Sequence, residues 1–439
     1  MVYRITVVGA GYLGATHAAC LAELGFEVLG MDVDATKVAA LSEGRLPCYE
    51  PGLEPLLRKH IESGRLRFTT SYGEVADFGD VHFLCVGTPQ RQDSFAADLS
   101  YLDAAVEGLA PHLNRTCLLV GKSTVPVGTA DRLASRVVEL APAGELVEVA
   151  WNPEFLREGH GVADTLAPDR MVLGIRTERA ERVLREIYAA VITAGAPVVV
   201  TDFSTAELVK SAANAFLTAK ISFINAMAEV CEATGADVTQ LAAALAHDPR
   251  IGGRFLHAGL GFGGGCLPKD LRAFIARVEE LGVDAAVALL QDVDAINTQR
   301  RTRMIDLARE QCDKTFTGRR IGVLGAAFKP NSDDIRDSPA LHVAAAIQRL
   351  GAQVTVYDPK AMDNARAQFP LLSYADSAVE AANGAHLVLH LTEWQEFRDM
   401  DPVVLSAVVA QKRMVDGRNA LDPAIWRSAG WTYRALGRP

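Results

Sequence analysis

The N-terminal half of the chain alternates between short apolar runs and longer segments with helical spacing. The apolar runs are "RITVVGAG", "EVLGMDVD", "DVHFLCVGTP", "TCLLVGKSTVP" and "LVEVAWNPEF". A helical pattern, "ATHAACLAELG", separates the first two runs and ends at Gly25. Strands spaced by helices in this way predict a parallel sheet with helices on both faces.

The segment 204–234 interrupts this alternation because it contains neither Gly nor Pro. It predicts a single helix of roughly 30 residues, about 45 Å long. Ser204 and Glu207 have the spacing of a capping box at its start. Apolar residues occur on nearly every side, which predicts a buried helix. Helical spacing continues over 268–281 and 284–312.

The strand pattern then restarts in the C-terminal part of the chain. The runs are "RRIGVLGAAFKP", "AQVTVYDP", "AHLVLHLTEW" and "KRMVDGRN". We therefore predict an α/β fold with two Rossmann-like doubly wound domains joined by a long central helix. The expected boundaries are 1–203, 204–316 and 317–439.

Composition restricts the class of protein. The chain has 439 residues, 49% of them hydrophobic, and a net charge of −10, and it has no long basic run. Nucleic acid and anionic membranes are therefore not expected partners. No apolar run reaches the ~18 residues of a membrane span, and no signal peptide pattern precedes the first strand. The seven cysteines lie at least 28 residues apart, without a CxxC pair. This spacing predicts no metal site, no disulfide framework and a reducing cytoplasm.

Gly9, Gly11 and Gly14 form G-x-G-x-x-G between the first strand and the first helix. This context is the fingerprint of a dinucleotide site, in which the pyrophosphate binds at the helix N-terminus. Asp32 closes the second strand and predicts NAD rather than NADP, because a carboxylate repels a 2′-phosphate. Lys37 lies close by and weakens that preference slightly. The second α/β domain lacks the fingerprint, and Asp358 after its second strand is interpreted as a turn residue.

Three further stretches carry reactive or polar groups on loops. "GFGGGCLPKD" places Cys266 on a glycine-rich backbone, where a thiol is accessible to a ligand. "KSTVPVGT" and "NPEFLREG" follow predicted strands at the sheet edge where α/β proteins bind ligands. Lys210 and Asn214 lie one turn apart on the long helix.

These residues resemble the UDP-glucose/GDP-mannose dehydrogenase family, the nucleotide-sugar dehydrogenases, and within it the UDP-glucose branch. The matching motifs run along the chain in order: "GAGYLG", "VGTP", "STVPVGT", "NPEFLREG", "KSAANAF", "RIGGRFLHAGLGFGGGCLPKD", "GAAFKPNSDDIRDS" and "DGRN". The resemblance implies an NAD-binding N-terminal domain, a central domain with the cysteine loop, and a UDP-sugar-binding C-terminal domain. It also implies oxidation of a sugar CH2OH to the carboxylate with two NAD.

By this resemblance, Cys266 forms a thiohemiacetal and then a thioester with the sugar carbon. Lys210, supported by Asn214, stabilises oxyanion charge, and Asp270 positions a water or manages protons near the thiol. Glu154, with Thr124, resembles the general-base pair that hydrolyses the thioester. The implied cofactor contacts are Gly9, Gly11, Tyr12, Leu13, Gly14, Asp32, Lys37, Thr88, Thr124, Glu158 and Arg336. The implied substrate contacts are Glu154, Phe155, Leu156, Lys210, Asn214, Arg250, Phe262, Gly263, Lys329 and Arg418.

Several assignments have a plainer alternative. Lys210 is otherwise a solvated helix lysine, Asp270 a cap of the helix over 268–281, and Arg250 a partner of Asp248. The cysteines other than Cys266 are interpreted as packing residues.

The sequence also departs from the family pattern. Gly265 precedes the cysteine where relatives often have Ser, Leu267 follows where UDP-glucose enzymes more often have Phe, and His257 replaces a common Lys. These differences leave TDP-glucose and GDP-mannose open as substrates.

The resemblance further implies a homodimer, in which Arg250 reaches the substrate of the neighbouring subunit. A two-electron dehydrogenase of the 6-phosphogluconate type shares the domain order, but a single hydride transfer needs no thiol. An NAD-sensing binding protein would not need Cys266, Lys210, Asp270 and Glu154 together.

Overall fold

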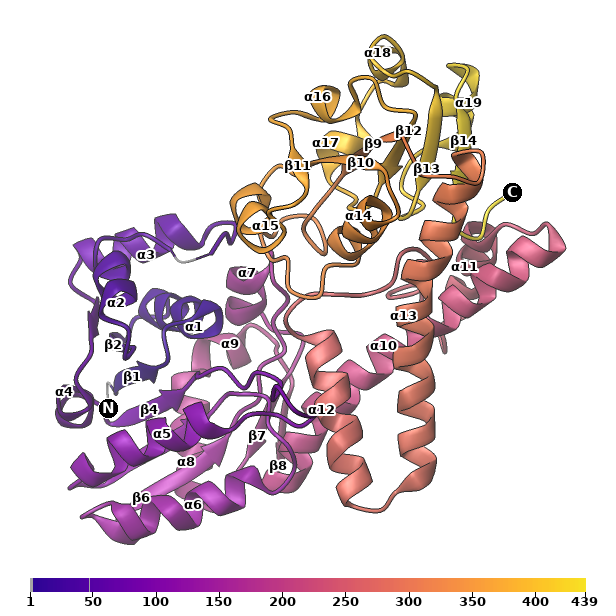
Figure 1. The fold of residues 1–439 in the computed structure, drawn as a ribbon. Helices are drawn as coiled ribbons and strands as arrows, with labels where there is room; N and C mark the ends of the chain where they lie inside the picture. The colour runs from indigo at the N-terminus through magenta and orange to yellow at the C-terminus, as the bar shows by residue number, and fades with distance from the viewer. Residues whose placement is uncertain (1–2, 47) are drawn as a thin grey trace. The chain divides into compact units, whose positions relative to one another are not determined.

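The computed structural model describes residues 3–46 and 48–439, and the chain divides into two compact units, Met1–Ala213 and Asn214–Pro439. Each unit contains one sheet, drawn in indigo to magenta for the first and in orange to yellow for the second (Figure 1). Two Rossmann-like sheet domains and a long central helix are thus confirmed. The three-part division at 204 and 317 stays a prediction.

The first unit is built on an eight-stranded sheet with the order β3-β2-β1-β4-β5-β6-β7-β8. Its strands are β1 (Arg4–Val8), β2 (Glu27–Met31), β3 (Leu66–Thr69), β4 (Val81–Leu84), β5 (Cys117–Gly121), β6 (Val147–Trp151), β7 (Met171–Gly174) and β8 (Val198–Thr201). All neighbouring strands pair in parallel except β6 and β7. The expected parallel sheet therefore has one antiparallel junction.

Helices cover both faces of this sheet. They are α1 (Tyr12–Glu23), α2 (Ala35–Ser42), α3 (Leu53–Glu62), α4 (Tyr72–Phe78), α5 (Ser100–Leu109), α6 (Thr129–Leu140), α7 (Gly161–Leu166), α8 (Glu178–Ile187) and α9 (Ala189–Thr193). Alternate strand residues face two separate cores, so that Leu118 packs with α1, α3 and α8, and Leu119 packs with α4, α5 and α6. Alternation of this kind is what a sheet buried on both faces requires.

The long helix α10 (Phe203–Thr234) confirms the expected span, but two predicted details are wrong. The capping box does not form, because Asp202 accepts the hydrogen bond from the Thr205 N–H at 2.8 Å. Glu207 instead accepts from Gly128 N–H at 2.7 Å and Ala130 N–H at 2.6 Å, at the start of α6. The helix is also not buried on every side, since apolar side chains along it are exposed.

The second unit contains the remaining helices of the central region and a six-stranded parallel sheet with the order β11-β10-β9-β12-β13-β14. The helices are α11 (Val238–Ala246), α12 (Leu267–Glu280) and α13 (Asp284–Gln311), of which the last two were expected. The strands are β9 (Arg320–Leu324), β10 (Gln353–Tyr357), β11 (Ser373–Tyr374), β12 (Leu387–His390), β13 (Arg413–Asp416) and β14 (Thr432–Ala435). The covering helices are α14 (Pro339–Arg349), α15 (Met362–Gln368), α16 (Ala378–Ala382), α17 (Gln395–Arg398), α18 (Pro402–Ser406) and α19 (Pro423–Ser428).

Asp358 is a buried structural carboxylate rather than a ligand contact. It follows β10 and accepts hydrogen bonds from Ala326 N–H, Ala327 N–H and the indole N–H of Trp394. These bonds fix the loop after β9, so the interpretation of Asp358 as a turn residue is confirmed. Among the described residues, no helix is long and apolar enough to cross a membrane.

Candidate active site

The glycine fingerprint forms a turn between β1 and α1 in which Gly9 and Gly14 could not be replaced by larger residues. Gly9 has φ +92°, a conformation that favours glycine, and a Cβ on Gly14 would lie 1.7 Å from the Gly9 carbonyl oxygen. Gly11 is the N-cap of α1, and open space lies where its Cβ would be. The turn therefore offers free N–H groups and close backbone approach, which is the cradle that a dinucleotide pyrophosphate fits.

Asp32 follows β2 and points its carboxylate at the same turn. Its Oδ2 accepts from Ala10 N–H at 2.9 Å and from Lys37 Nζ at 2.9 Å, and its Oδ1 accepts from Asp34 N–H at 3.1 Å. Burial alone would raise the pKa of Asp32, but these hydrogen bonds outweigh it and lower the pKa. The carboxylate is therefore ionised at neutral pH, with Lys37 as its partner.

Tyr12 connects the fingerprint to two other loops through Glu50, a residue that the sequence analysis missed. The Tyr12 hydroxyl donates to Glu50 Oε2 at 2.6 Å, and Glu50 also accepts from Gly159 N–H at 2.6 Å and Gly161 N–H at 2.8 Å. Burial, together with the negative charge of Glu50, raises the pKa of Tyr12. Glu50 thus fixes the loop that carries Glu158, the predicted cofactor contact. Leu13 packs against the core of the first unit.

The loops after β4 and β5 are joined by two hydroxyl groups. Thr88 Oγ1 donates to the Thr124 carbonyl at 2.8 Å, and Ser123 Oγ donates to the Val86 carbonyl at 2.7 Å. Thr88 was predicted to contact the cofactor, and its hydroxyl positions the Thr124 backbone. Thr124 is half-buried, at the carboxyl edge of the sheet.

Glu154, in the loop after β6, has hydrogen-bond or ion-pair partners at both carboxylate oxygens. Its Oε1 accepts from the Phe155 and Leu156 N–H groups at 2.7 and 2.9 Å, and its Oε2 lies 3.1 Å from Lys122 Nζ. Burial would raise the pKa of Glu154, but the Lys122 ammonium, these hydrogen bonds and the Lys210 charge lower it. Glu154 is therefore a largely buried, ion-paired carboxylate rather than a surface carboxylate.

Lys210 lies on α10 with 9% of its surface exposed, so it is not a solvated lysine. Its Nζ is 5.4 Å from the ring centroid of Phe155, and the Arg170 guanidinium lies 3.9 Å from the same centroid. Among the described residues, Lys210 has no hydrogen-bond or ion-pair partner. A buried ammonium of this kind is available to a developing negative charge.

In the second unit, Cys266 is the N-cap of α12, and its thiol is exposed. The dipole at a helix N-terminus favours negative charge on a group placed there. The other cysteines are buried, apart from half-buried Cys48. Burial raises the pKa of Cys85 to about 12, so that this thiol stays protonated.

Asp270 is buried in the first turn of α12 and does not cap the helix. Its Oδ2 accepts from Asn214 Nδ2 at 2.7 Å and its Oδ1 from Lys269 Nζ at 2.6 Å. The Asp270 N–H donates to the Cys266 carbonyl at 2.8 Å. Asn214, Asp270 and Cys266 therefore form one connected group in the second unit.

The glycines before Cys266 are held by the loop after β9. Gly264 N–H donates to the Arg336 carbonyl at 2.8 Å, and Gly265 N–H donates to Asp334 Oδ2 at 3.2 Å. A Cβ on Gly265 would lie 2.1 Å from the Arg336 guanidinium carbon.

Arg418 and Asn297 hold the same loop from two other elements. The Arg418 guanidinium donates to the carbonyls of Leu391, Gly261 and Phe328 at 2.7, 3.0 and 3.0 Å. Asn297 on α13 exchanges two hydrogen bonds with the Phe262 backbone, at 2.8 and 3.1 Å. Sequence reasoning missed Asn297 because its signal is a single polar residue within a long helix.

The remaining predicted substrate contacts in this unit are dispersed. Gly263 approaches Asp337 closely, since a Cβ there would lie 2.5 Å from the Asp337 carbonyl oxygen. Lys329 Nζ lies 5.3 Å from the Phe328 ring centroid. Arg250 is 86% exposed and pairs with Asp248 at 2.6 Å, as its alternative interpretation expected.

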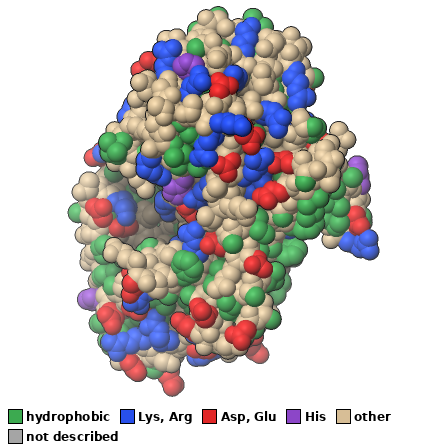
Figure 2. All heavy atoms as spheres, turned by 45° about the vertical axis from the view of Figure 1, so that its right-hand side comes forward, with side chains coloured by type: hydrophobic (Ala, Val, Ile, Leu, Met, Phe, Trp, Pro, Cys, Tyr) green, Lys and Arg blue, Asp and Glu red, His purple; other side chains and the backbone are tan. Residues whose placement is uncertain are grey.

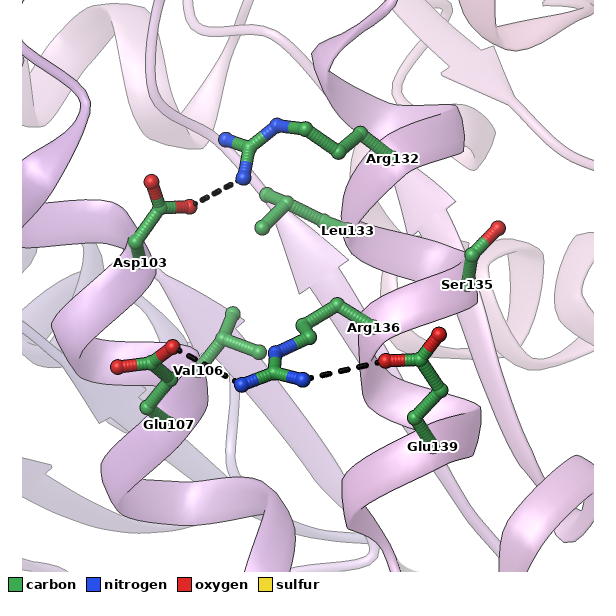
Figure 3. Close-up of a pocket in the computed structure, with 8 residues that line it drawn as sticks. All are labelled: Asp103, Val106, Glu107, Arg132, Leu133, Ser135, Arg136 and Glu139. Carbon is green, nitrogen blue, oxygen red and sulfur yellow. Dashed lines mark hydrogen bonds and ion pairs between the residues drawn. The ribbon is translucent and has the colours of Figure 1, made fainter.

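A separate hollow of about 460 Å³ lies between α5 and α6 and contains none of the predicted site residues. Figure 3 shows Arg132 pointing toward Asp103, and Arg136 between Glu107 and Glu139. Its three carboxylates and two guanidinium groups pair with one another within the hollow. Within residues 3–46 and 48–439, no cluster of three His, Cys, Asp or Glu side chains is arranged to hold a metal ion.

A Rossmann-type fingerprint on one sheet and an exposed thiol at a helix N-terminus define the class as a dinucleotide-binding α/β protein with an accessible cysteine. Family models match three segments: the NAD binding domain of the UDP-glucose/GDP-mannose dehydrogenase family over residues 3–192, its central domain over 204–299, and its UDP binding domain over 322–423. The chain belongs to the UDP-glucose/GDP-mannose dehydrogenase family.

Individual relatives match along nearly the whole chain. A UDP-glucose 6-dehydrogenase of Rhizobium meliloti is 41% identical, over 99% of this chain and 100% of the relative. The UDP-glucose 6-dehydrogenase AglM of Haloferax volcanii is 42% identical, over 99% and 100%. The structure of a UDP-glucose dehydrogenase from Pyrobaculum islandicum has a TM-score of 0.92 and 38% identity, over 100% of this chain and 98% of that one.

Proposed function

We propose that this protein is an NAD-dependent UDP-glucose 6-dehydrogenase that converts the C6 hydroxymethyl group of UDP-glucose to the carboxylate of UDP-glucuronate. The observation that carries the proposal is the exposed Cys266 thiol at the start of α12, in a chain that also has the family's NAD and UDP binding domains. Support also comes from relatives of similar length that bear this name.

The cradle of Gly9, Gly11 and Gly14 would hold the NAD pyrophosphate, and Asp32 would hold its adenosine ribose. NAD supplies the oxidant for both oxidations when it is bound. Arg336, Glu158 and Thr88 remain proposed contacts to it.

Covalent attachment of the substrate to Cys266 allows the enzyme to carry out two successive two-electron oxidations. Its thiolate sulfur bonds to C6 of the aldehyde made in the first oxidation, and the aldehyde oxygen takes a proton to complete the thiohemiacetal. Loss of that proton and of the C6 hydride in the second oxidation leaves a thioester. Lys210 stabilises negative charge on the C6 oxygen, and the Asn214–Asp270 pair orders groups beside the thiol.

Hydrolysis of the thioester uses Glu154 and Thr124. A water oriented by Thr124 attacks the thioester carbon while Glu154 accepts its proton, and the carbon–sulfur bond breaks to release the carboxylate and the Cys266 thiolate. We place the reaction in the cytoplasm, where Cys266 stays reduced.

The identity of the nucleotide is the finer part of this proposal. Gly265, Leu267 and His257 leave TDP-glucose and GDP-mannose as alternatives with the same mechanism. Initial rates with UDP-glucose, TDP-glucose and GDP-mannose test the choice. We expect the highest kcat/KM with UDP-glucose, and a higher value with either alternative would replace it as the substrate.

Asp32 leads to a prediction about the cofactor. Its ionised carboxylate repels a 2′-phosphate, while Lys37 offsets only part of that charge. We expect kcat/KM with NADP to be at least ~10-fold below that with NAD, or about 1.4 kcal/mol. Equal or better use of NADP in the same assay would contradict the assignment.

We also propose that the enzyme is a homodimer. Phe216, Phe223 and Val230 recur every seven residues along α10 and are 68%, 51% and 51% exposed. Apolar side chains are visible on the face of the second unit that carries α10 to α13 (Figure 2). An exposed apolar row of this kind is what a second copy of the chain would cover.

A dimer allows Arg250 to act on the substrate of the neighbouring subunit. The Arg250 side chain is exposed, and its ion-pair partner, Asp248, belongs to the same loop. The Arg250 side chain is therefore available to a neighbouring subunit. We expect mixtures of inactive Arg250→Ala and Cys266→Ala proteins to regain activity, since a hybrid dimer contains one intact site. Native mass spectrometry provides the control for subunit exchange, and a mixture that exchanges but stays inactive would overturn the trans role.

A further inference from the structure

The structure contains a fully buried lysine, Lys122, to which neither the family resemblance nor the sequence analysis gave a role. It follows β5, and 4% of its surface is exposed. Its Nζ donates to Asn152 Oδ1 at 3.1 Å and lies 3.1 Å from Glu154 Oε2. Burying an ammonium costs free energy unless it is paired with an opposite charge. The presence of Lys122 at this buried position therefore calls for an explanation.

Asn152 and Tyr188 fix the position of this ammonium. The Tyr188 hydroxyl donates to Asn152 Oδ1 at 2.8 Å, and Asn152 Nδ2 donates to the Val172 carbonyl at 2.9 Å. Asn152 Oδ1 therefore accepts from both Lys122 and Tyr188, and its orientation is determined by β7. These hydrogen bonds thus fix the Lys122 Nζ in a position from which it contacts one carboxylate oxygen of Glu154.

Two cations, Lys122 and Lys210, lower the pKa of Glu154, together with hydrogen bonds from the Phe155 and Leu156 N–H groups. Tyr188, Cys85 and Cys20 also face this carboxylate, and burial raises the pKa of each of them to about 12. Burial likewise lowers the pKa of His17, which faces Lys122, far below its usual range. These four groups are neutral at working pH, which leaves Lys122 and Lys210 to balance the carboxylate.

Of the two cations, Lys122 is the one in contact with Glu154. Among the described residues, Lys210 forms no hydrogen bond or ion pair with Glu154. Lys210 is instead the group proposed to stabilise charge on the C6 oxygen. We propose that Lys122 is a positioning residue that keeps Glu154 ionised and aimed throughout the catalytic cycle, so that thioester hydrolysis can proceed at neutral pH. This inference rests on the proposed role of Glu154 as the base.

The substitution Lys122→Met removes the ammonium and keeps the volume of the side chain. Glu154 is then buried beside Lys210 alone, and its pKa rises above the usual range because burial is no longer offset by a contacting cation. Protonated Glu154 cannot accept a proton from water. Hydrolysis should therefore fail at low pH and recover as pH rises through the new pKa.

The test separates hydrolysis from the oxidations. The covalent adduct is formed with UDP-glucose and NAD at pH 6, small molecules are removed, and adduct decay is followed by intact-protein mass spectrometry from pH 6 to 9. For Lys122→Met we expect decay at least ~10-fold slower than wild type at pH 7, with a midpoint at about pH 8 or above, whereas wild type should show no midpoint from Glu154 between pH 6 and 9. Glu154→Gln should decay slowly without such a midpoint. The control Lys59→Met, which breaks an exposed pair with Glu23, should match wild type.

Stability gives a second readout that does not require turnover. A carboxylate whose folded pKa is raised stabilises the fold at low pH and loses that contribution as pH rises through the raised value. The Tm of Lys122→Met should thus fall more than the Tm of wild type between pH 6 and 8. The Tm of the double variant, Lys122→Met with Glu154→Gln, should fall no more than that of wild type. If Lys122→Met cannot be purified, Lys122→Gln takes its place in both assays.

The outcomes are distinct. If Glu154→Gln retains the adduct but Lys122→Met hydrolyses it like wild type at every pH, the positioning role is wrong. If Glu154→Gln retains no adduct, the proposed role of Glu154 is wrong, and the role of Lys122 in hydrolysis is overturned with it.

Discussion

Replacing Cys266 with serine should reduce formation of the uronate more than a hundredfold, a loss of over about 2.7 kcal/mol of transition-state stabilisation. A thiolate is a strong nucleophile, whereas a serine hydroxyl is a poor nucleophile without a strong base. Steady-state rates, combined with calorimetric binding of UDP-glucose and NAD, measure the effect.

Binding should remain nearly normal in Cys266→Ser because the side chain keeps its size. Cys231→Ser provides a matched control, since Cys231 is buried in α10 and has no role in the mechanism. We expect that control to keep most of its activity. Uronate formation at a near wild-type rate by Cys266→Ser would mean that the thiol is not the nucleophile and that the glycines of this loop only shape a turn.

Replacing Glu154 with glutamine should stop the reaction at a later step. Cys266 and Lys210 are unchanged, so both oxidations proceed and the thioester accumulates. We expect hydrolysis to slow ~100-fold or more, the usual range for loss of a general base. Intact-protein mass spectra should then show a mass increase equal to the oxidised sugar nucleotide.

Glu148→Gln is the matched control for this experiment. Glu148 lies on the same strand, β6, and pairs with Arg179 at 3.3 Å away from the Glu154 loop. The control should turn over without a stable adduct. If the Glu154→Gln protein carries no adduct and turns over normally, Glu154 has no role in hydrolysis.

The central strands and the long helices could be predicted from the sequence because their signals are strong. Strands such as β1, β4 and β5 are buried on both faces and read as continuous apolar runs. Four of the missed strands, β3, β8, β11 and β14, lie at sheet edges, where short and partly exposed segments lose that pattern. The fifth, β7, was missed although it is buried inside the sheet. The antiparallel junction at β7 follows from a chain reversal after β6 that no local motif indicates.

Candidate site residues could be proposed wherever a residue lies within a recognisable motif. Cys266, Glu154 and Asp32 were proposed in this way, and their roles stay predictions. Lys122 and Glu50 were not, because their importance comes from contacts with residues far along the chain. Glu207 shows the opposite error, in which a valid local pattern was overridden by the tertiary contact with the start of α6.

The most direct test of the account is the number of NADH molecules formed for each UDP-glucose consumed. The reaction is followed to completion at limiting UDP-glucose, with the sugar products identified by mass spectrometry. If Cys266 retains the aldehyde and carries it to the thioester, two NADH and one UDP-glucuronate form for each UDP-glucose, and no free aldehyde is detected. One NADH for each UDP-glucose, with the 6-aldehyde released into solution, would contradict the four-electron mechanism.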